Sequence, residues 1–216
     1  PHIVFQAPSD QYYPGPGAWG ISRTPPTSGI SQPPVAASCL RQILKARPDD
    51  PALRQRCAPI LHALYRWHRW WHEIRDPDAT GLVACLHPWE TGRDNSCEWD
   101  APLRAIAPTM SVGHLRKDIL HADPAERPTN DYYDRVMTLV EEGKSVGWDG
   151  PGFMRRSSFR VCDLGIQCLL LRSDEDLAAL ARAAGLHALA AELDAWRAHS
   201  RAALMVMPST PDLAAP

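Results

Sequence analysis

The residue types best suited to chemistry occur together in the segment 87–100, which reads HPWETGRDNSCEWD. Carboxylates stand at four of its positions, Glu90, Asp94, Glu98 and Asp100. Its tryptophans, Trp89 and Trp99, offer these carboxylates apolar surface, and an indole ring also suits the C–H faces of sugars. A loop that presents acidic groups to a cavity would have this composition. An ordinary surface loop before a capped helix would have it too. The residue types alone leave both interpretations open.

A glycine pattern near the N-terminus predicts no nucleotide site. Gly15, Gly17 and Gly20 satisfy G-x-G-x-x-G. Dinucleotide binding requires this pattern between a strand and a helix, because the helix N-terminus holds the pyrophosphate. No strand is expected before these glycines, and proline-rich sequence follows them.

Two histidines, His68 and His72, have the spacing of metal ligands on one helix face. A zinc metalloprotease needs a glutamate base directly after the first histidine, and here that position is Arg69. His62 and Glu73 are further candidate ligands. A basic, amphipathic helix surface explains these residues without a metal, so we expect no metal site and no cofactor.

The segment 87–100 resembles the signature HPWES-G-x-DNSP-x-WD of the bacterial glucosylglycerate and mannosylglycerate hydrolases of glycoside hydrolase family 63. Four further blocks, in the same order, extend the resemblance from Pro1 to about Arg201. They are PHIVF with YYPGPGAWG, PTSGISQPPVAA at 26–37, RPTNDYYDR at 127–135, and FRVCD with LLLRSDEDLAALA between 159 and 181. The resemblance implies an all-α fold, an (α/α)6 barrel of twelve helices in two rings, of which this chain holds about half.

The resemblance also implies an inverting glycosidase that acts on a small α-glycoside such as glucosylglycerate or mannosylglycerate. In such an enzyme one carboxyl protonates the glycosidic oxygen, and a carboxylate on the opposite face activates water, at a separation of roughly 6.5 to 9.5 Å. Asp94 matches the family's general acid. A helix N-terminus after Asp94 lowers its pKa, so desolvation by Trp89 and Trp99, with like charge nearby, must outweigh the helix dipole.

Residues that bind the substrate are implied in the same way. Gln32 matches a glutamine that hydrogen-bonds the sugar. Arg127 and Tyr133 match the pair that holds the polar aglycone, where a guanidinium suits a glycerate carboxylate. The expected pocket wall contains Trp19, Trp89 and Glu90. For each of these residues, ordinary packing or solvation at a helix start is the alternative interpretation.

The chain also departs from the family pattern. Cys97 replaces a proline and Thr91 a serine, and residues 165–167 replace an aromatic residue and an asparagine. The family's general base is a downstream glutamate that has no counterpart before Pro216, and the resemblance ends near Ala203. We therefore expect poor solubility and little or no turnover from this chain alone. The alternative function is a non-catalytic carbohydrate-binding remnant of the same fold.

Apolar periodicity predicts about seven helices and no strand pair. The expected helices span 35–44, 51–75, 95–106, 129–143, 161–171, 173–184 and 188–204. Capping residues are expected at Asp50, at Asn95 with Glu98, and at Ser173 with Asp176. The first 34 residues, rich in proline and glycine, form a long loop that their aromatic side chains should order. We expect one partial barrel domain over 1–204 and an irregular tail over 205–216.

The composition excludes several other classes of protein. The 216 residues are 44 % hydrophobic and 22 % charged, as in an ordinary globular chain. A net charge of -2 gives no basic excess for a nucleic acid partner. No stretch approaches the roughly 18 apolar residues that cross a bilayer. Six cysteines without a C-x-x-C motif predict reduced thiols and a cytoplasmic location. The sequence does not predict the oligomeric state.

Overall fold

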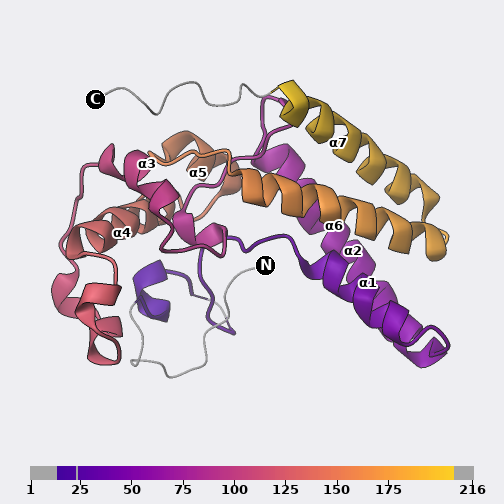
Figure 1. Ribbon diagram of the computed structural model, residues 1–216, viewed down its shortest axis with the longest axis horizontal. Coiled ribbons are helices and arrows are strands. Elements are labelled where there is room, and N and C mark those ends of the chain that lie inside the picture. The colour runs from indigo at the N-terminus through magenta and orange to yellow at the C-terminus, as the bar shows by residue number, and fades with distance from the viewer. Residues whose placement is uncertain (1–13, 23, 207–216) are drawn as a thin grey trace. The chain divides into compact units, whose positions relative to one another are not determined.

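The structure is a computed structural model that describes residues 14–22 and 24–206, and it is all-α across them (Figure 1). An isolated antiparallel bridge pairs Cys85 with Val161. The chain divides into two compact units. Unit 1 contains Pro1–Pro33 and Ala84–Asp163, and unit 2 contains Pro34–Val83 and Leu164–Pro216. The predicted all-α class is confirmed.

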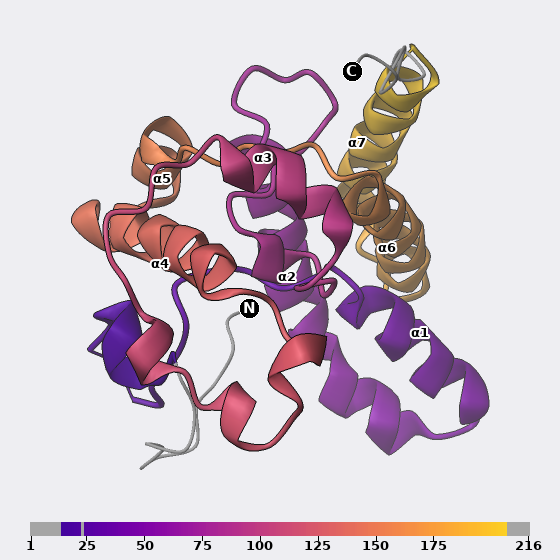
Figure 2. The same cartoon turned by 60° about the vertical axis from the view of Figure 1, so that its left-hand side comes forward.

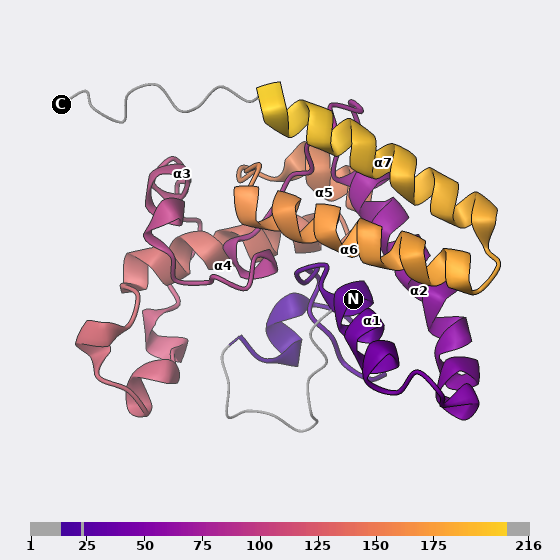
Figure 3. The same ribbon diagram turned by 45° about the vertical axis from the view of Figure 1, so that its right-hand side comes forward.

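Unit 2 consists of two helical hairpins. They are formed by α1 (Ala36–Ala46) with α2 (Pro51–Ile74), and by α6 (Leu164–Ala183) with α7 (His187–Val206). Figure 3 shows α6 and α7 running side by side. Helix α6 also contacts α1 and α2, and its buried Leu177 packs with Leu61 and Leu193 in the core of the unit. The apolar stripes predicted from the sequence therefore face one another.

Two helix ends in unit 2 follow the predicted capping chemistry. The Asp50 carboxylate accepts the backbone N–H of Leu53 at 2.8 Å, and Pro51 occupies the first helical position. After α6, Gly185 has a φ of 75°, a left-handed conformation that stops a helix at little cost for glycine. The predicted start of α2 is confirmed, and α6 ends at Ala183, one residue before the expected end at 184.

The predicted break between 171 and 173 is wrong, because α6 is continuous from Leu164 to Ala183. Ser173 and Asp176 lie inside this helix and cap nothing. Both side chains are buried, and Asp176 forms ion pairs with Arg41 and Arg172. Because tertiary partners bind these polar side chains, the side chains do not cap a new helix, and α6 continues through them.

Unit 1 is organised around α4 (Asn130–Ser145), with α3 (Asp100–Arg104) and α5 (Gly150–Arg156) beside it (Figure 2). Thr129 begins α4 as predicted, and its hydroxyl accepts the N–H of Tyr132 at 3.2 Å. Buried residues of α4 form the core of the unit with Trp19, Trp99 and Phe159. Helix α5 was not predicted, although Asp149, which accepts the N–H of Gly152, supplies a recognisable N-cap.

The predicted helix over 95–106 is wrong in its extent. A 3-10 turn, η3 (Cys97–Trp99), is followed by the five-residue α3. Pro102 explains the difference, since proline is tolerated in the first turn of a helix and not in its interior. Ser96 rather than Asn95 is the cap, and its hydroxyl accepts the N–H of Glu98 at 3.5 Å.

Further 3-10 turns connect the rest of unit 1. They are η1 (Pro16–Trp19), η2 (Pro88–Glu90), η4 (Gly113–Leu115), η5 (Asp118–Leu120) and η6 (Pro124–Glu126). The glycine pattern at 15–20 therefore forms a tight turn, and the matched block PHIVF lies outside the described residues. All six cysteines are free thiols. No helix in the described part of the chain is both long and apolar enough to span a membrane. The single domain over 1–204 stays a prediction; α7 includes residues 205 and 206 of the expected tail, and 207–216 lie outside the described residues.

Candidate active site

Glu90 joins two segments of unit 1 that are far apart in the sequence. Its Oε1 accepts the N–H of Ser31 at 3.0 Å, and its Oε2 accepts the N–H of Leu86 at 2.8 Å. Ser31 directly precedes Gln32, whose Nε2 donates to the Ser31 carbonyl at 2.8 Å. Because the Glu90 side chain is 0 % exposed, it holds the backbone beside Gln32 instead of facing a ligand. The structure thus gives Glu90 a different place from the expected pocket wall.

Three of the predicted aromatic residues pack together. The ring of Trp89 lies edge-on to Trp19, at 6.2 Å between centroids, and at 6.4 Å from the ring of Tyr133. Trp19 is buried, and its carbonyl accepts the indole N–H of Trp148 at 2.8 Å. Trp89 remains partly exposed. Of the two predicted wall tryptophans, Trp89 therefore has surface for a ligand, and Trp19 supports it from the core.

Asp94 lies on the exposed loop between η2 and η3, and neighbouring groups fix its backbone. The hydroxyl of Tyr132, from the first turn of α4, donates to the Asp94 carbonyl. The preceding residue, Arg93, accepts the indole N–H of Trp99 at 2.7 Å through its carbonyl and pairs with Glu98 and Asp163 through its guanidinium. The carboxyl of Asp94 thus stands on a loop that is held on both sides.

The electrostatic environment of Asp94 suits a proton donor. Desolvation by the surrounding protein raises the pKa of Asp94 above its ordinary value, although its own backbone N–H and the guanidinium of Arg127 act to lower it. A carboxyl with a raised pKa keeps its proton to higher pH, which general acid catalysis requires.

The expected aglycone residues meet beside this loop. Arg127 donates from Nη2 to the Tyr133 hydroxyl at 3.3 Å and from Nε to Asp118 at 2.8 Å. Arg116 lies over the Tyr133 ring, with its guanidinium carbon 4.2 Å from the ring centroid. Desolvation raises the pKa of Tyr133, so its hydroxyl remains protonated at neutral pH. Sequence reasoning missed Arg116, which directly follows η4, and Asp118, which begins η5, because no motif surrounds them.

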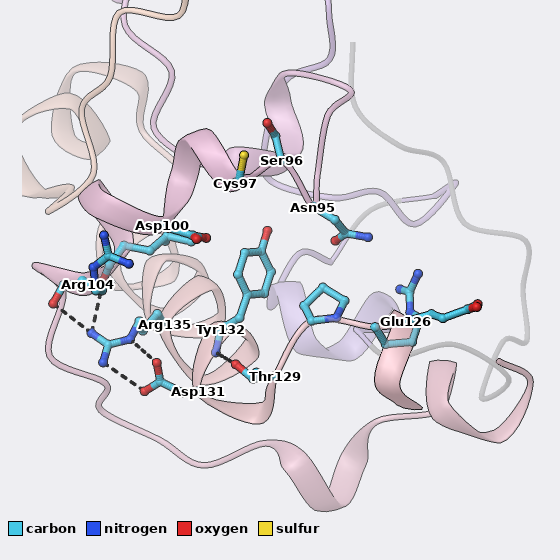
Figure 4. A pocket seen from close by; sticks show the side chains of 13 residues that line it. Asn95, Ser96, Cys97, Asp100, Arg104, Glu126, Thr129, Asp131, Tyr132 and Arg135 are labelled. Atoms are coloured by element: carbon cyan, nitrogen blue, oxygen red, sulfur yellow. Dashed lines mark hydrogen bonds and ion pairs between the residues drawn. The ribbon is translucent and has the colours of Figure 1, made fainter. Parts of the chain in front are cut away.

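A cavity of about 510 Å³ opens between the segment after Asp94 and the start of α4 (Figure 4). The side chain of Tyr132 stands between Asn95 and Asp100 in this view. Among the predicted site residues, Arg127 lines this cavity, and Asp94 adjoins it through Asn95. The lining residues are Asn95, Ser96, Cys97, Asp100, Leu103, Arg104, Glu126, Arg127, Pro128, Thr129, Asp131, Tyr132 and Arg135.

The histidines considered as metal ligands lie in unit 2 and share a carboxylate. His68 Nδ1 is 2.7 Å from one oxygen of Asp174, and His72 Nε2 is 2.9 Å from the other. Over the described ranges, the structure contains no cluster of three or more potential ligands arranged to hold a metal ion. The arrangement links α2 to α6.

Comparison with known proteins identifies the family. The model of the mannosylglycerate hydrolase MGH1-like glycoside hydrolase domain matches residues 1–207. The chain belongs to this family. A mannosylglycerate hydrolase from Selaginella moellendorffii is 40 % identical over 204 residues, which are 94 % of this chain. A glucosylglycerate hydrolase from Mycolicibacterium hassiacum is 37 % identical over 177 residues, or 76 % of the chain.

A solved member of the family has the same fold as the chain. The crystal structure of the family 63 mannosylglycerate hydrolase from Thermus thermophilus, in complex with Tris and D-glycerate, matches 95 % of the chain with a TM-score of 0.86 and 38 % identity. The chain spans less than half of each relative: 42 % and 40 % of the two hydrolases and 48 % of the solved structure. This MGH1-like chain therefore corresponds to about half of a family member.

Proposed function

We propose that the chain supplies the general-acid part of an inverting glycoside hydrolase that cleaves glucosylglycerate or mannosylglycerate. The observation that carries this proposal is the position of Asp94, a solvent-accessible carboxyl of raised pKa on a held loop beside Arg127 and Tyr132. Membership of the family supports the reaction class, and the names of the relatives support the substrate class.

The chemistry assigned to Asp94 is proton donation. A glycosidic oxygen is a poor leaving group near neutral pH, so a protonated carboxyl must donate to it as the bond to the anomeric carbon breaks. Water then adds from the opposite face and loses its proton to a second carboxylate. We assign that base to the part of the family fold that this chain does not span. The sugar ring would lie against the exposed surface of Trp89, near Gln32.

The proposed aglycone site is the pair formed by Arg127 and Tyr133. A guanidinium binds a carboxylate through two parallel hydrogen bonds, which suits the carboxylate of glycerate. The solved relative that holds D-glycerate supports this ligand class. The choice between glucose and mannose depends on pocket contacts worth a few kcal/mol, and it belongs to the rest of the site.

The alternative is a carbohydrate-binding protein without catalysis. It is favoured by the packing of Trp89 with Tyr133 and the hydrogen bond between Tyr133 and Arg127, which together offer an aromatic surface and donors to a sugar acid. In that case the protein binds the glycoside without releasing product, and added azide has no effect on it.

The test is hydrolysis by the chain combined with a polypeptide that corresponds to the remaining part of a relative. We expect released glycerate, detected by NMR, and loss of at least about a hundredfold in rate in Asp94→Asn, since general acid catalysis contributes roughly 10²–10⁴-fold. Glu141→Gln, which changes a carboxylate of α4 that pairs with Lys144 and not with the Asp94 loop, is the control and should retain the rate. An Asp94→Asn rate equal to that of the unmodified chain would remove Asp94 from the mechanism.

A further inference from the structure

Asp118 accepts hydrogen bonds from both residues of the proposed aglycone site. Its Oδ2 accepts the Nε–H of Arg127 at 2.8 Å and the hydroxyl of Tyr133 at 3.3 Å. Arg127 donates in turn to the Tyr133 oxygen at 3.3 Å. The three side chains thus form a closed triangle of hydrogen bonds, in which Asp118 is the common acceptor.

Arg116 fixes Asp118 from the other side. Its Nε and Nη2 donate to the two oxygens of Asp118 at 3.1 and 2.8 Å, the paired geometry of a strong guanidinium–carboxylate contact. Its Nη1 donates to Asn130, the first residue of α4, at 2.9 Å. The Arg116 side chain is only 4 % exposed. Arg116 therefore fixes the position of the Asp118 carboxylate, and Asp118 in turn fixes Arg127.

The triangle determines which donors Arg127 keeps for a ligand. Its Nε is bonded to Asp118 and its Nη2 to Tyr133, while Nη1 has no hydrogen-bond partner among the described residues. The guanidinium is planar, so fixing two of its nitrogens fixes the direction of the third. The hydrogen bond from Arg116 holds the pKa of Asp118 well below its usual range, and the carboxylate therefore stays charged and keeps its acceptor role at neutral pH.

We propose that Asp118, anchored by Arg116, is a positioning residue that aims Arg127 and Tyr133 at the carboxylate of the aglycone. The inference rests on the proposed function, because it takes these two residues as the aglycone site. Asp118 does not itself touch the ligand.

The direction in which binding affinity changes distinguishes a positioning role of Asp118 from a purely electrostatic one. Asp118 is an anion beside a site that we expect to bind an anion, so electrostatics alone predicts tighter binding when its charge is removed. Loss of orientation predicts weaker binding, because a guanidinium that must be ordered during binding gives less affinity. The two roles therefore predict opposite changes for the same substitution.

The experiment is calorimetric titration of D-glycerate into the chain, with Asp118→Asn compared against Asp123→Asn. Asp123 is exposed in the same connecting region, and it caps η6 through a hydrogen bond that asparagine also makes, so its substitution removes one negative charge without touching Arg127 or Tyr133. We expect the Kd of Asp118→Asn to rise about tenfold, the effect of one lost charge-assisted hydrogen bond. Asp123→Asn should bind as tightly as the unmodified chain or slightly tighter.

A ligand-free measurement and a second variant complete the test. The Nε–H proton of Arg127 should exchange slowly with water in the unmodified chain and rapidly in Asp118→Asn, as followed by NMR. Arg116→Lys keeps the charge and loses the paired contact, so its Kd should rise less, in the same direction. Asp118→Asn binding D-glycerate as tightly as the unmodified chain, or more tightly, overturns the inference. An unmodified chain that shows the slow exchange and binds no D-glycerate contradicts the proposed aglycone site instead, and the inference falls with it.

Discussion

At the scale of residues, Asp94 shows how a loop carboxyl acquires the properties of an acid. It is accessible to a substrate, and the protein around it still removes enough water to raise its pKa. The nearby guanidinium of Arg127 acts to lower the pKa of Asp94 and so limits this rise. The balance of the two leaves the pKa of Asp94 above its ordinary value.

This balance predicts a pH dependence. A general acid works while it is protonated, so the activity of the complete enzyme should fall as the pH rises through the raised pKa of Asp94. Replacing Arg127 by Gln removes the opposing charge and should shift this fall to higher pH, in addition to weakening substrate binding. Profiles of kcat/KM against pH for both proteins check the prediction. A fall at the same or lower pH in Arg127→Gln would contradict it.

The site residues differ in whether the sequence alone can identify their role. Asp94, Gln32, Arg127 and Tyr133 were assigned because short motifs surround them. Glu90 also lies in a motif, but its burial and its bonds to two distant backbone groups depend on the fold. Asp118 was missed because the contact that gives it a role joins turns through side chains, which no spacing along the chain encodes.

At the scale of elements, helix positions were predictable where an apolar stripe and a local cap agreed, as in α2 and α4, while α1 and α7 followed from the stripe alone. The prediction failed where a local signal competed with a tertiary contact. Ser173 to Asp176 is a good capping box by composition, yet its acidic groups are paired with α1 and α2 inside unit 2. Pro102 is the opposite case, because this local signal was not used in the prediction of a helix over 95–106.

The buried carboxylate of Asp174 yields a prediction about how α6 is held to α2. Burial alone raises the pKa of Asp174, but hydrogen bonds from His68 and His72 outweigh it and leave the pKa lowered. Asp174→Ala leaves both histidines without their acceptor and should destabilise the chain by about 3 kcal/mol, because buried hydrogen-bonding groups then lose their partner. Thermal unfolding followed by circular dichroism measures this loss.

The neighbouring Glu175 provides the control, since its pair with Arg197 is exposed and such pairs contribute about 1 kcal/mol or less. The pH dependence of stability gives a second check. A carboxyl of lowered pKa contributes stability above its unfolded value near 3.9, and this contribution is lost as the pH falls through the folded value. Acid should therefore destabilise the unmodified chain more than Asp174→Ala. Equal acid sensitivity of the two would count against the assigned role.

At the scale of the whole molecule, unit 2 exposes several large apolar side chains. Leu164 is 61 % exposed, and Met205 and Val206 are each 80 % exposed. The chain spans less than half of the relatives it matches. A large exposed apolar surface favours association.

The prediction is that the chain associates when it is alone and does so less when the remaining part of a relative is supplied. Sedimentation velocity over a range of concentrations should show rising average mass for the chain alone and one defined complex for the mixture. Replacing Leu164 and Met205 by Ser should reduce the association of the chain alone. A chain that stays monomeric at every concentration would contradict the prediction.

Consecutive tyrosines at the start of α4 have a consequence for which substrates can be cleaved. Tyr132 holds the loop of the proposed acid, and Tyr133 holds the guanidinium of the proposed aglycone site. Under the proposed function, neighbouring residues of a single helical turn would therefore set the distance between the cleaved bond and the bound carboxylate. A glycoside whose acid group lies one or two bonds farther from the sugar would still bind, but with the wrong atom opposite Asp94.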